Sequence, residues 1–144
     1  MNKTIEHFKR QIGQTVTQTP SPVGLWLKGK LIDIELGSLT ADIEIREEMT
    51  NPGGMLHGGS AALICDELIG AAVASLEKPT PFVSVNLHTE FLRPVRKGDT
   101  VRAKSEIIRN GKTVINAECK IYNAQGKLVV KSQSNLTAIQ KPNK

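Results

Sequence analysis

The sequence predicts an α+β fold in which an antiparallel sheet of about six strands wraps around one long central helix. Residues 58–76 are almost wholly apolar, which is typical of a helix that is buried on most sides. Several other segments alternate apolar and polar residues, as half-buried strands do. A chain of 144 residues suits a single core, so the helix and the sheet are expected to share it.

The first third of the chain predicts a short helix, a loop and a pair of strands. Residues 3–11 place Ile5 and Phe8 on one helical face, and the prolines that follow indicate a loop. We therefore expect residues 1–21 to form an N-terminal helix and loop. Residues 32–36 and 41–46 alternate around a short turn, which predicts an antiparallel pair.

Beyond the central helix, which the prolines after Glu77 end, the chain reads as a run of strands. Residues 82–92 alternate, with Val83, Val85, Leu87 and Phe91 on one side. Two more strands are joined by Asn110–Gly111, a strong hairpin signal. A last strand covers residues 127–139, and the polar tail, 140–144, is expected to be flexible. We expect one domain over residues 1–144.

The composition narrows the possible partners. The net charge of +5 suits a partner that carries phosphates. Aromatic residues make up only 3% of the chain, which argues against nucleic acid as that partner. Cys65 and Cys119 fit no metal-ligand spacing, so we expect buried thiols and no metal site. No stretch is long enough to span a membrane and no secretory signal is visible, which predicts a cytoplasmic location.

The most informative feature is a glycine-rich loop that leads into the central helix. After Asn51 the loop reaches His57-Gly58-Gly59, and Asp66 follows about two helical turns later. A carboxylate on a buried helix is costly unless it has partners or a task. This combination points to a chemical role for the start of the helix.

The order of these residues resembles that of the hotdog-fold thioesterases, most of all the acyl-CoA thioesterases of the phenylacetic-acid-degradation type. Leu63, Gly70 and a glycine at 53 or 54 also match, as do residues 83–87 and 93–99. The resemblance covers roughly residues 22 to 139. It implies a homodimer or homotetramer with active sites at a subunit interface, and an acyl-CoA substrate.

The resemblance also implies a role for individual residues. Asn51 and Gly58 would come from one protomer and Asp66 from the other, with Ser84 as an accessory group. Strict alternation, however, puts Ser84 on the opposite side of its strand from Val83 and Val85. If those valines meet the helix, Ser84 points away from the site.

The residue types suit thioester hydrolysis. Asp66 can act as a general base for water or attack directly as a nucleophile. The Gly58 N–H, at the positive end of the helix, can hold the developing oxyanion. Asn51 can orient the water or the carbonyl, and His57 is expected to shape the loop. No cofactor is needed, because coenzyme A is part of the substrate.

Other residues are candidates for binding the substrate. Glu67 lies about 100° around the helix from Asp66, as an interface charge or as the second-choice carboxylate. Gly59 permits close approach to the helix start. Arg93, beside Arg96 and Lys97, can meet the phosphates of coenzyme A, as can a second group at the 110–111 turn. That second group comprises Arg109, Gly111 and Lys112.

Two alternatives remain open at this point. The same fold could support an enoyl-thioester hydratase or dehydratase that uses His57 and Asp66, or a non-catalytic acyl-CoA-binding protein. The sequence does not define the acyl group, the choice between coenzyme A and a carrier protein, or the choice between dimer and tetramer.

Overall fold

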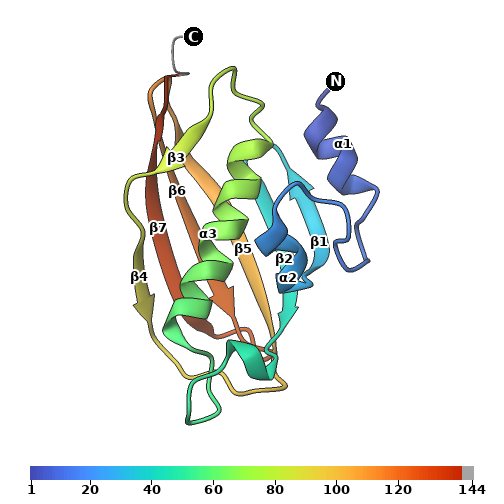
Figure 1. The fold of residues 1–144 in the computed structure, drawn as a ribbon, viewed down its shortest axis with the longest axis vertical. Coiled ribbons are helices and arrows are strands. Elements are labelled where there is room, and N and C mark those ends of the chain that lie inside the picture. The colour runs from blue at the N-terminus through green and yellow to red at the C-terminus, as the bar shows by residue number, and fades with distance from the viewer. Residues whose placement is uncertain (141–144) are drawn as a thin grey trace.

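A computed structural model describes residues 1–140 and shows a curved sheet around one helix (Figure 1). The helices are α1 (Lys3–Lys9), α2 (Pro22–Leu27), η1 (Glu47–Met49) and α3 (Gly58–Ala74). The strands are β1 (Lys30–Glu35), β2 (Ser38–Glu44), β3 (Phe82–Ser84), β4 (His88–Phe91), β5 (Thr100–Asn110), β6 (Val114–Tyr122) and β7 (Leu128–Ala138). The predicted fold class is confirmed. The predicted flexible tail lies, from residue 141 on, outside the described residues.

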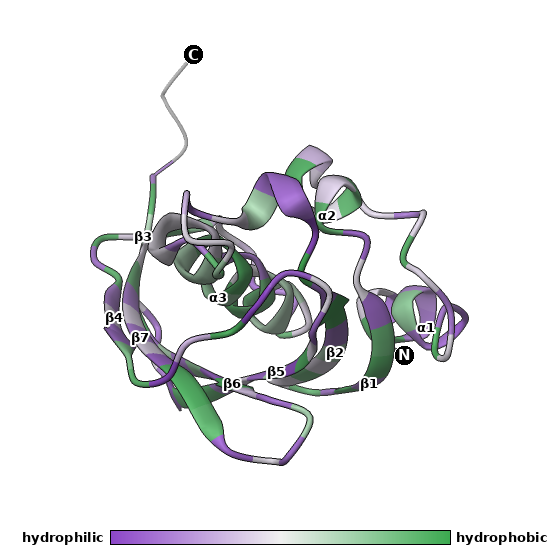
Figure 2. Cartoon of the chain, turned by 90° about the horizontal axis from the view of Figure 1, so that it is seen from below, coloured by the Kyte–Doolittle hydropathy of each residue, from purple (hydrophilic) through white to green (hydrophobic). Residues whose placement is uncertain are grey.

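The sheet is antiparallel throughout, in the order β1-β2-β5-β6-β7-β3, and β4 also pairs with β7. It curls around α3, while α1 and α2 lie to one side of that helix (Figure 2). Strands β2, β5 and β6 follow the predicted alternation, with every second residue buried against the core. Strand β1 does not, because its register shifts between Leu31 and Asp33: Leu31 and Ile34 are buried, Ile32 is half-buried, and Leu36 is exposed in the turn.

The face of α3 that meets the sheet explains why this segment is so apolar. The buried residues of the helix are Ala61, Ile64, Cys65, Leu68, Ile69 and Ala72. All of them except Ala72 belong to one core cluster with residues of β1, β2, β5, β6 and β7. Burying one such large aliphatic side chain contributes about 2 kcal/mol, so this contact is a major source of stability.

The opposite face of α3 is open, which corrects the expectation that the helix is buried on nearly every side. Gly59, Asp66, Gly70 and Ala74 are exposed and lie along one stripe. Because residues three and four apart share a helical face, the stripe runs the length of the helix. In the single chain Asp66 is therefore an exposed carboxylate and not a buried one.

The predicted strand 82–92 is divided into β3 and β4, and the division reverses the alternation. Ser84 pairs with Leu136 and His88 pairs with Gln133, so four steps on this edge oppose three steps on β7. The extra residue on this edge forms a β-bulge that includes Asn86. The Asn86 Oδ1 accepts a hydrogen bond from the Asn135 N–H at 2.8 Å.

The bulge decides which side chains face α3. Side chains alternate with period two, so one extra residue inverts the pattern after it. Ser84 and Phe91 consequently face the same side of the sheet, while Val83 and Val85 are exposed. The prediction that Phe91 shares a side with Val83 and Val85 was wrong for this reason.

The sequence analysis placed a loop where α2 forms. Ser21 caps this helix by accepting a hydrogen bond from the Gly24 N–H at 3.2 Å, and Pro22 occupies its first turn. Serine before proline is a typical helix start.

Among residues 1–140, no helix combines the length and the apolar character that a membrane span requires.

The two thiols are buried and free, as predicted. The neighbouring Cys65 and burial raise the pKa of the Cys119 thiol well above its usual value. Cys119 is therefore a protonated, inert part of the core.

Candidate active site

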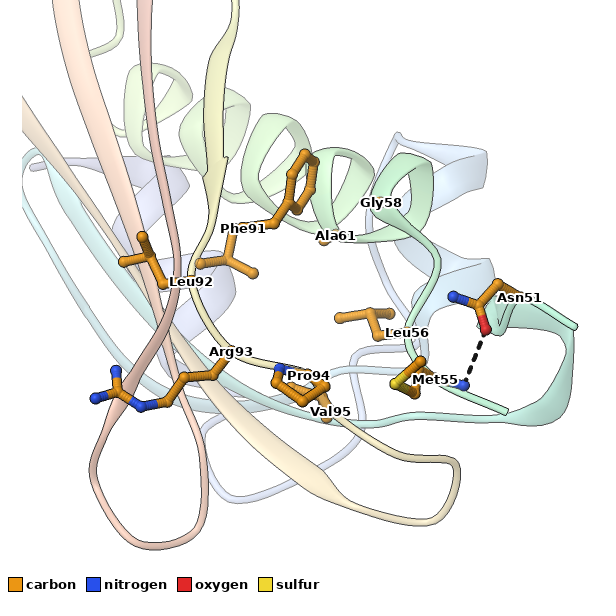
Figure 3. A pocket seen from close by; sticks show the side chains of 11 residues that line it. Asn51, Met55, Leu56, Gly58, Ala61, Phe91, Leu92, Arg93, Pro94 and Val95 are labelled. Atoms are coloured by element: carbon orange, nitrogen blue, oxygen red, sulfur yellow. Dashed lines mark hydrogen bonds between the residues drawn. The ribbon is translucent and has the colours of Figure 1, made fainter. Parts of the chain in front are cut away.

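A cavity of about 420 Å³ lies at the first turn of α3 (Figure 3). Its size falls in the range of small-molecule sites. The lining is mostly apolar and comes from the loop before α3, the helix itself, and the segment from β4 to β5. The lining residues are Asn51, Met55, Leu56, Gly58, Ala61, Phe91, Leu92, Arg93, Pro94, Val95 and Val130.

Asn51 shapes the loop at the edge of this cavity. Its Oδ1 accepts hydrogen bonds from the N–H groups of Gly53, at 3.0 Å, and Met55, at 3.2 Å. The side chain thereby closes a tight turn, as asparagine often does. The acceptor is thus used within the loop, so only the Nδ2 amide is left to donate to a substrate.

His57 caps the start of α3 with its ring. Its Nδ1 accepts a hydrogen bond from the Gly59 N–H at 2.9 Å, so this nitrogen carries no proton. Capping α3 is thus the structural role of His57. Because the Gly59 N–H donates to His57, it is already engaged within the chain.

The Gly58 N–H is a free donor at the cavity. It belongs to the first turn of α3, where helical N–H groups have no partner within the helix. Among residues 1–140, no hydrogen bond from this N–H is found. The positive end of the α3 dipole adds to its attraction for an oxyanion.

Asp66 lies on the open face of α3, and Ser84 reaches it from β3. The Ser84 hydroxyl donates to the Asp66 Oδ1 at 3.4 Å, which is long for such a bond. Ser84, the residue implied by family resemblance, therefore faces the helix. It lies on the opposite side of its strand from Val83 and Val85, as alternation predicts, but those valines do not meet the helix. The bulge between β3 and β4 is the physical reason.

Gly58 and Asp66 do not converge within one chain. They are eight residues apart on the same helix, which corresponds to about 12 Å along its axis. Asp66 is also absent from the lining of the cavity at Gly58. One chain therefore presents two candidate half-sites on α3, the Gly58 N–H beside the cavity and the Asp66 carboxylate beside Ser84.

Glu67 lies apart from both half-sites. It is half-buried and lines a small cavity, with Phe8, Thr19 and Gly24, between the N-terminal segment and the helix. Its position 100° from Asp66 turns it toward α2 and away from Ser84. The structure does not bring Glu67 together with Gly58.

The two basic groups lie at opposite ends of the sheet. Arg93 lines the cavity at Gly58, and its Nη1 donates to the Leu128 carbonyl at 2.8 Å. Gly111 lies near the end of α3, because its carbonyl accepts from Lys78 Nζ at 3.1 Å. Arg109 and Lys112 flank that turn, so within one chain they are remote from Arg93 (Figure 1).

Sequence reasoning missed Phe91 as a residue of the site. Its ring lies against Gly58, but alternation alone marked it only as an apolar strand residue. The bulge that turns it toward α3 carries no strong signal in the sequence, although Asn86 is a residue type that favours irregular backbone. Among residues 1–140, no group of three His, Cys, Asp or Glu side chains could hold a metal ion.

The fold and these half-sites belong to a known class of protein. The Thioesterase superfamily matches residues 53–130, more than half of the chain, and the chain belongs to this family. The expectation of a hotdog-fold thioester hydrolase is thereby confirmed.

Individual relatives support this membership. The chain is 35% identical over 108 residues to a candidate esterase of Saccharolobus solfataricus, covering 74% of this chain and 76% of that protein. It is 28% identical over 104 residues to acyl-coenzyme A thioesterase 13 of Homo sapiens, covering 72% and 74%.

Solved structures share the fold. The PaaI protein of the E. coli phenylacetic acid degradation operon has a TM-score of 0.78 at 21% identity, covering 94% of this chain and 91% of that chain. A thioesterase protein of Streptococcus pneumoniae, solved with coenzyme A, has a TM-score of 0.73 at 21% identity, covering 80% and 88%.

Proposed function

We propose that this protein hydrolyses an acyl-CoA thioester to the free acid and coenzyme A. The supporting observation is that α3 presents a free Gly58 N–H beside an apolar cavity and an exposed Asp66 beside a serine. The human relative is named an acyl-coenzyme A thioesterase, and one structural neighbour was solved with coenzyme A.

The active site is proposed to form between two copies of the chain. If two α3 helices cross antiparallel at Ala62, midway between Gly58 and Asp66, each Gly58 comes near the partner's Asp66. Gly59, Ala62 and Gly70 have small side chains, which allow two helices to approach closely. The smallest assembly that completes a site is then a homodimer, and a tetramer would pair two dimers.

In this arrangement the thioester carbonyl accepts a hydrogen bond from the Gly58 N–H. Asp66 of the second copy takes a proton from water, which attacks the carbonyl and expels the thiolate. Alternatively, Asp66 attacks the carbonyl directly and expels the thiolate, and water then cleaves the resulting anhydride to the free acid and Asp66. The Gly58 donor holds the negative oxygen that develops, a contribution of about 3 kcal/mol in comparable sites. The thiolate leaves without a separate acid, because its conjugate acid, the thiol, has a pKa of about 8.5 as judged by free cysteine.

The remaining side chains support this step. Ser84 orients the carboxylate of Asp66, and the Asn51 amide can donate to the water or the carbonyl. Arg93, whose guanidinium points away from the cavity (Figure 3), is a candidate for meeting phosphates outside it. If the helices are antiparallel, Arg109 and Lys112 from the far end of the second copy are candidates as well. His57 keeps the first turn of α3 in place through the bond to Gly59.

Thiol release from a panel of acyl-CoA and aryl-CoA esters tests the reaction. The wild-type chain should release coenzyme A from at least one ester, and Asp66→Asn should lower kcat by about 10³-fold. Hydration of an enoyl-CoA without thiol release would favour the hydratase alternative. Binding of esters without turnover would contradict the proposal.

Subunit complementation tests the shared site. Asp66→Asn and Asn51→Ala chains are each expected to be poorly active. A mixed dimer has one site with neither change, so mixing after partial unfolding and refolding should restore up to about half of the activity of a two-site dimer. An unchanged low activity in a verified mixed dimer would place both residues in one chain's site.

A further inference from the structure

Phe91 forms the wall of the cavity directly beside the proposed oxyanion donor. A Cβ atom built on Gly58 would lie 3.2 Å from Phe91 Cζ and 3.4 Å from Cε1, so the ring packs against the glycine itself. The ring stands alongside the first turn of α3, next to Ala61 (Figure 3). An acyl group whose carbonyl oxygen is held by Gly58 must therefore place its first carbon atoms next to this ring.

The same cavity suits the acyl part of the substrate better than the pantetheine arm. Most of its lining is aliphatic, including Leu56, Leu92 and Val130. The pantetheine arm carries two amide groups, which would lose free energy in such a lining unless they found hydrogen-bond partners. An acyl group needs no polar partner beyond its carbonyl.

Phe91 is also free to limit the space at this point, because it is not part of the core. Its exposed fraction is 59%, and it lies on the edge strand β4 after the bulge. A phenylalanine side chain has fewer rotatable bonds than methionine, so it adapts less to a bound group. Because the ring packs against Gly58, it bounds the space next to the carbonyl carbon.

We propose that Phe91 determines specificity by excluding acyl groups that are branched at the carbon next to the thioester carbonyl. This inference rests on the proposed acyl-CoA hydrolysis and defines the substrate class of that same site. Acyl groups with a CH₂ at this carbon, whether alkyl or arylacetyl, fit beside the ring. A second substituent at this carbon collides with it.

The test compares kcat/KM for butyryl-CoA, isobutyryl-CoA and pivaloyl-CoA in wild type and in Phe91→Ala, Phe91→Leu and Phe91→Trp. The ratio of branched to linear activity should rise about tenfold or more in Phe91→Ala, rise less in Phe91→Leu, and fall in Phe91→Trp. Because each ratio compares two substrates on one preparation, it does not depend on the folded fraction of a variant.

Leu36→Ala is the matched control, because Leu36 is also a large exposed apolar residue, at 67%, but lies in the turn between β1 and β2. Its ratio should equal that of wild type. A ratio that stays within twofold of wild type in all three Phe91 variants would overturn the assignment. If wild type hydrolyses none of these or longer esters, the proposed function fails instead, so the two failures are distinct.

Discussion

The two sides of α3 that turn away from the sheet differ in what covers them. On one side, Asp66 is exposed, and its carboxylate accepts a hydrogen bond from the Ser84 hydroxyl of the edge strand. On the other, Glu67 is half-buried beneath α1, α2 and the loop between them. Two adjacent carboxylates thus have different surroundings, which supports the proposal that the open side carries the chemistry while the covered side contributes stability.

The largest expected effect separates the two carboxylates directly. Asp66→Asn should lower kcat by about 10³-fold, because the amide can neither accept a proton nor attack. Glu67→Gln, the matched change one residue away, should alter kcat by less than about threefold. Steady-state thiol release on both variants measures this, and an equal loss in the two would erase the distinction.

Substitutions on the covered side of α3 should lower the free energy of unfolding rather than kcat. Phe8→Ala removes the buried side chain of α1, which is 9% exposed and belongs to the core cluster. The loss should be about 3 kcal/mol in the free energy of unfolding, with kcat of the folded enzyme retained. Urea unfolding at fixed protein concentration measures the loss. Val23→Ala, at an exposed position of α2, should cost far less, and a similar cost in both variants would argue against close packing here.

His57 is a test case for the contrast between the two sides, because it is exposed on the open side and yet is expected to stabilise α3 through its cap. His57→Ala should lose about 1 kcal/mol, since the N-cap bond to Gly59 disappears. His57→Asn supplies another good capping side chain and should recover most of this stability. Urea midpoints of the two variants decide it, and equal midpoints would mean that the ring contributes through something other than the cap.

The smallest effect concerns the N-terminus of α1, on the covered side. Glu77 Oε1 accepts a hydrogen bond from the Thr4 N–H at 2.9 Å, which holds the pKa of Glu77 below its ordinary value of 4.5. A carboxyl group whose pKa is lowered on folding stabilises the folded state at pH values above its ordinary pKa. This stabilisation is lost as the pH falls through the lowered pKa of the folded state.

Glu77→Gln should therefore be slightly less stable than wild type at pH 7, and the difference should vanish well below pH 4.5. Urea midpoints of both proteins from pH 7 to pH 3 measure this. A difference that stays constant with pH would show that the charge of Glu77 plays no part.

Much of this molecule follows from local patterns in the sequence. The apolar run of α3 and the alternation in β2, β5 and β6 are direct consequences of one shared core. The start of α3 at Gly58 was also predictable, because the glycine-rich loop ends there; the helix ends at Ala74, two residues before the predicted end.

The remaining features depend on contacts that no local pattern contains. The exposure of Asp66 follows from an open face that the single chain leaves uncovered, and α3 itself is apolar all round. The orientation of Ser84 depends on how many residues of β7 oppose residues 84–88. The short helix α2 was missed because Pro22 was interpreted as part of a loop and not as the first turn after a Ser21 cap.

The bulge at Asn86 makes the number of residues here more important than their identity. Deleting one residue between 84 and 88 would restore the alternation and turn either Ser84 or Phe91 to the outer surface. A point substitution at the same place would leave both orientations intact. Engineers who exchange this edge between related scaffolds should therefore preserve its length first, since a single-residue gap would remove either the Ser84 contact with Asp66 or the Phe91 contact with Gly58.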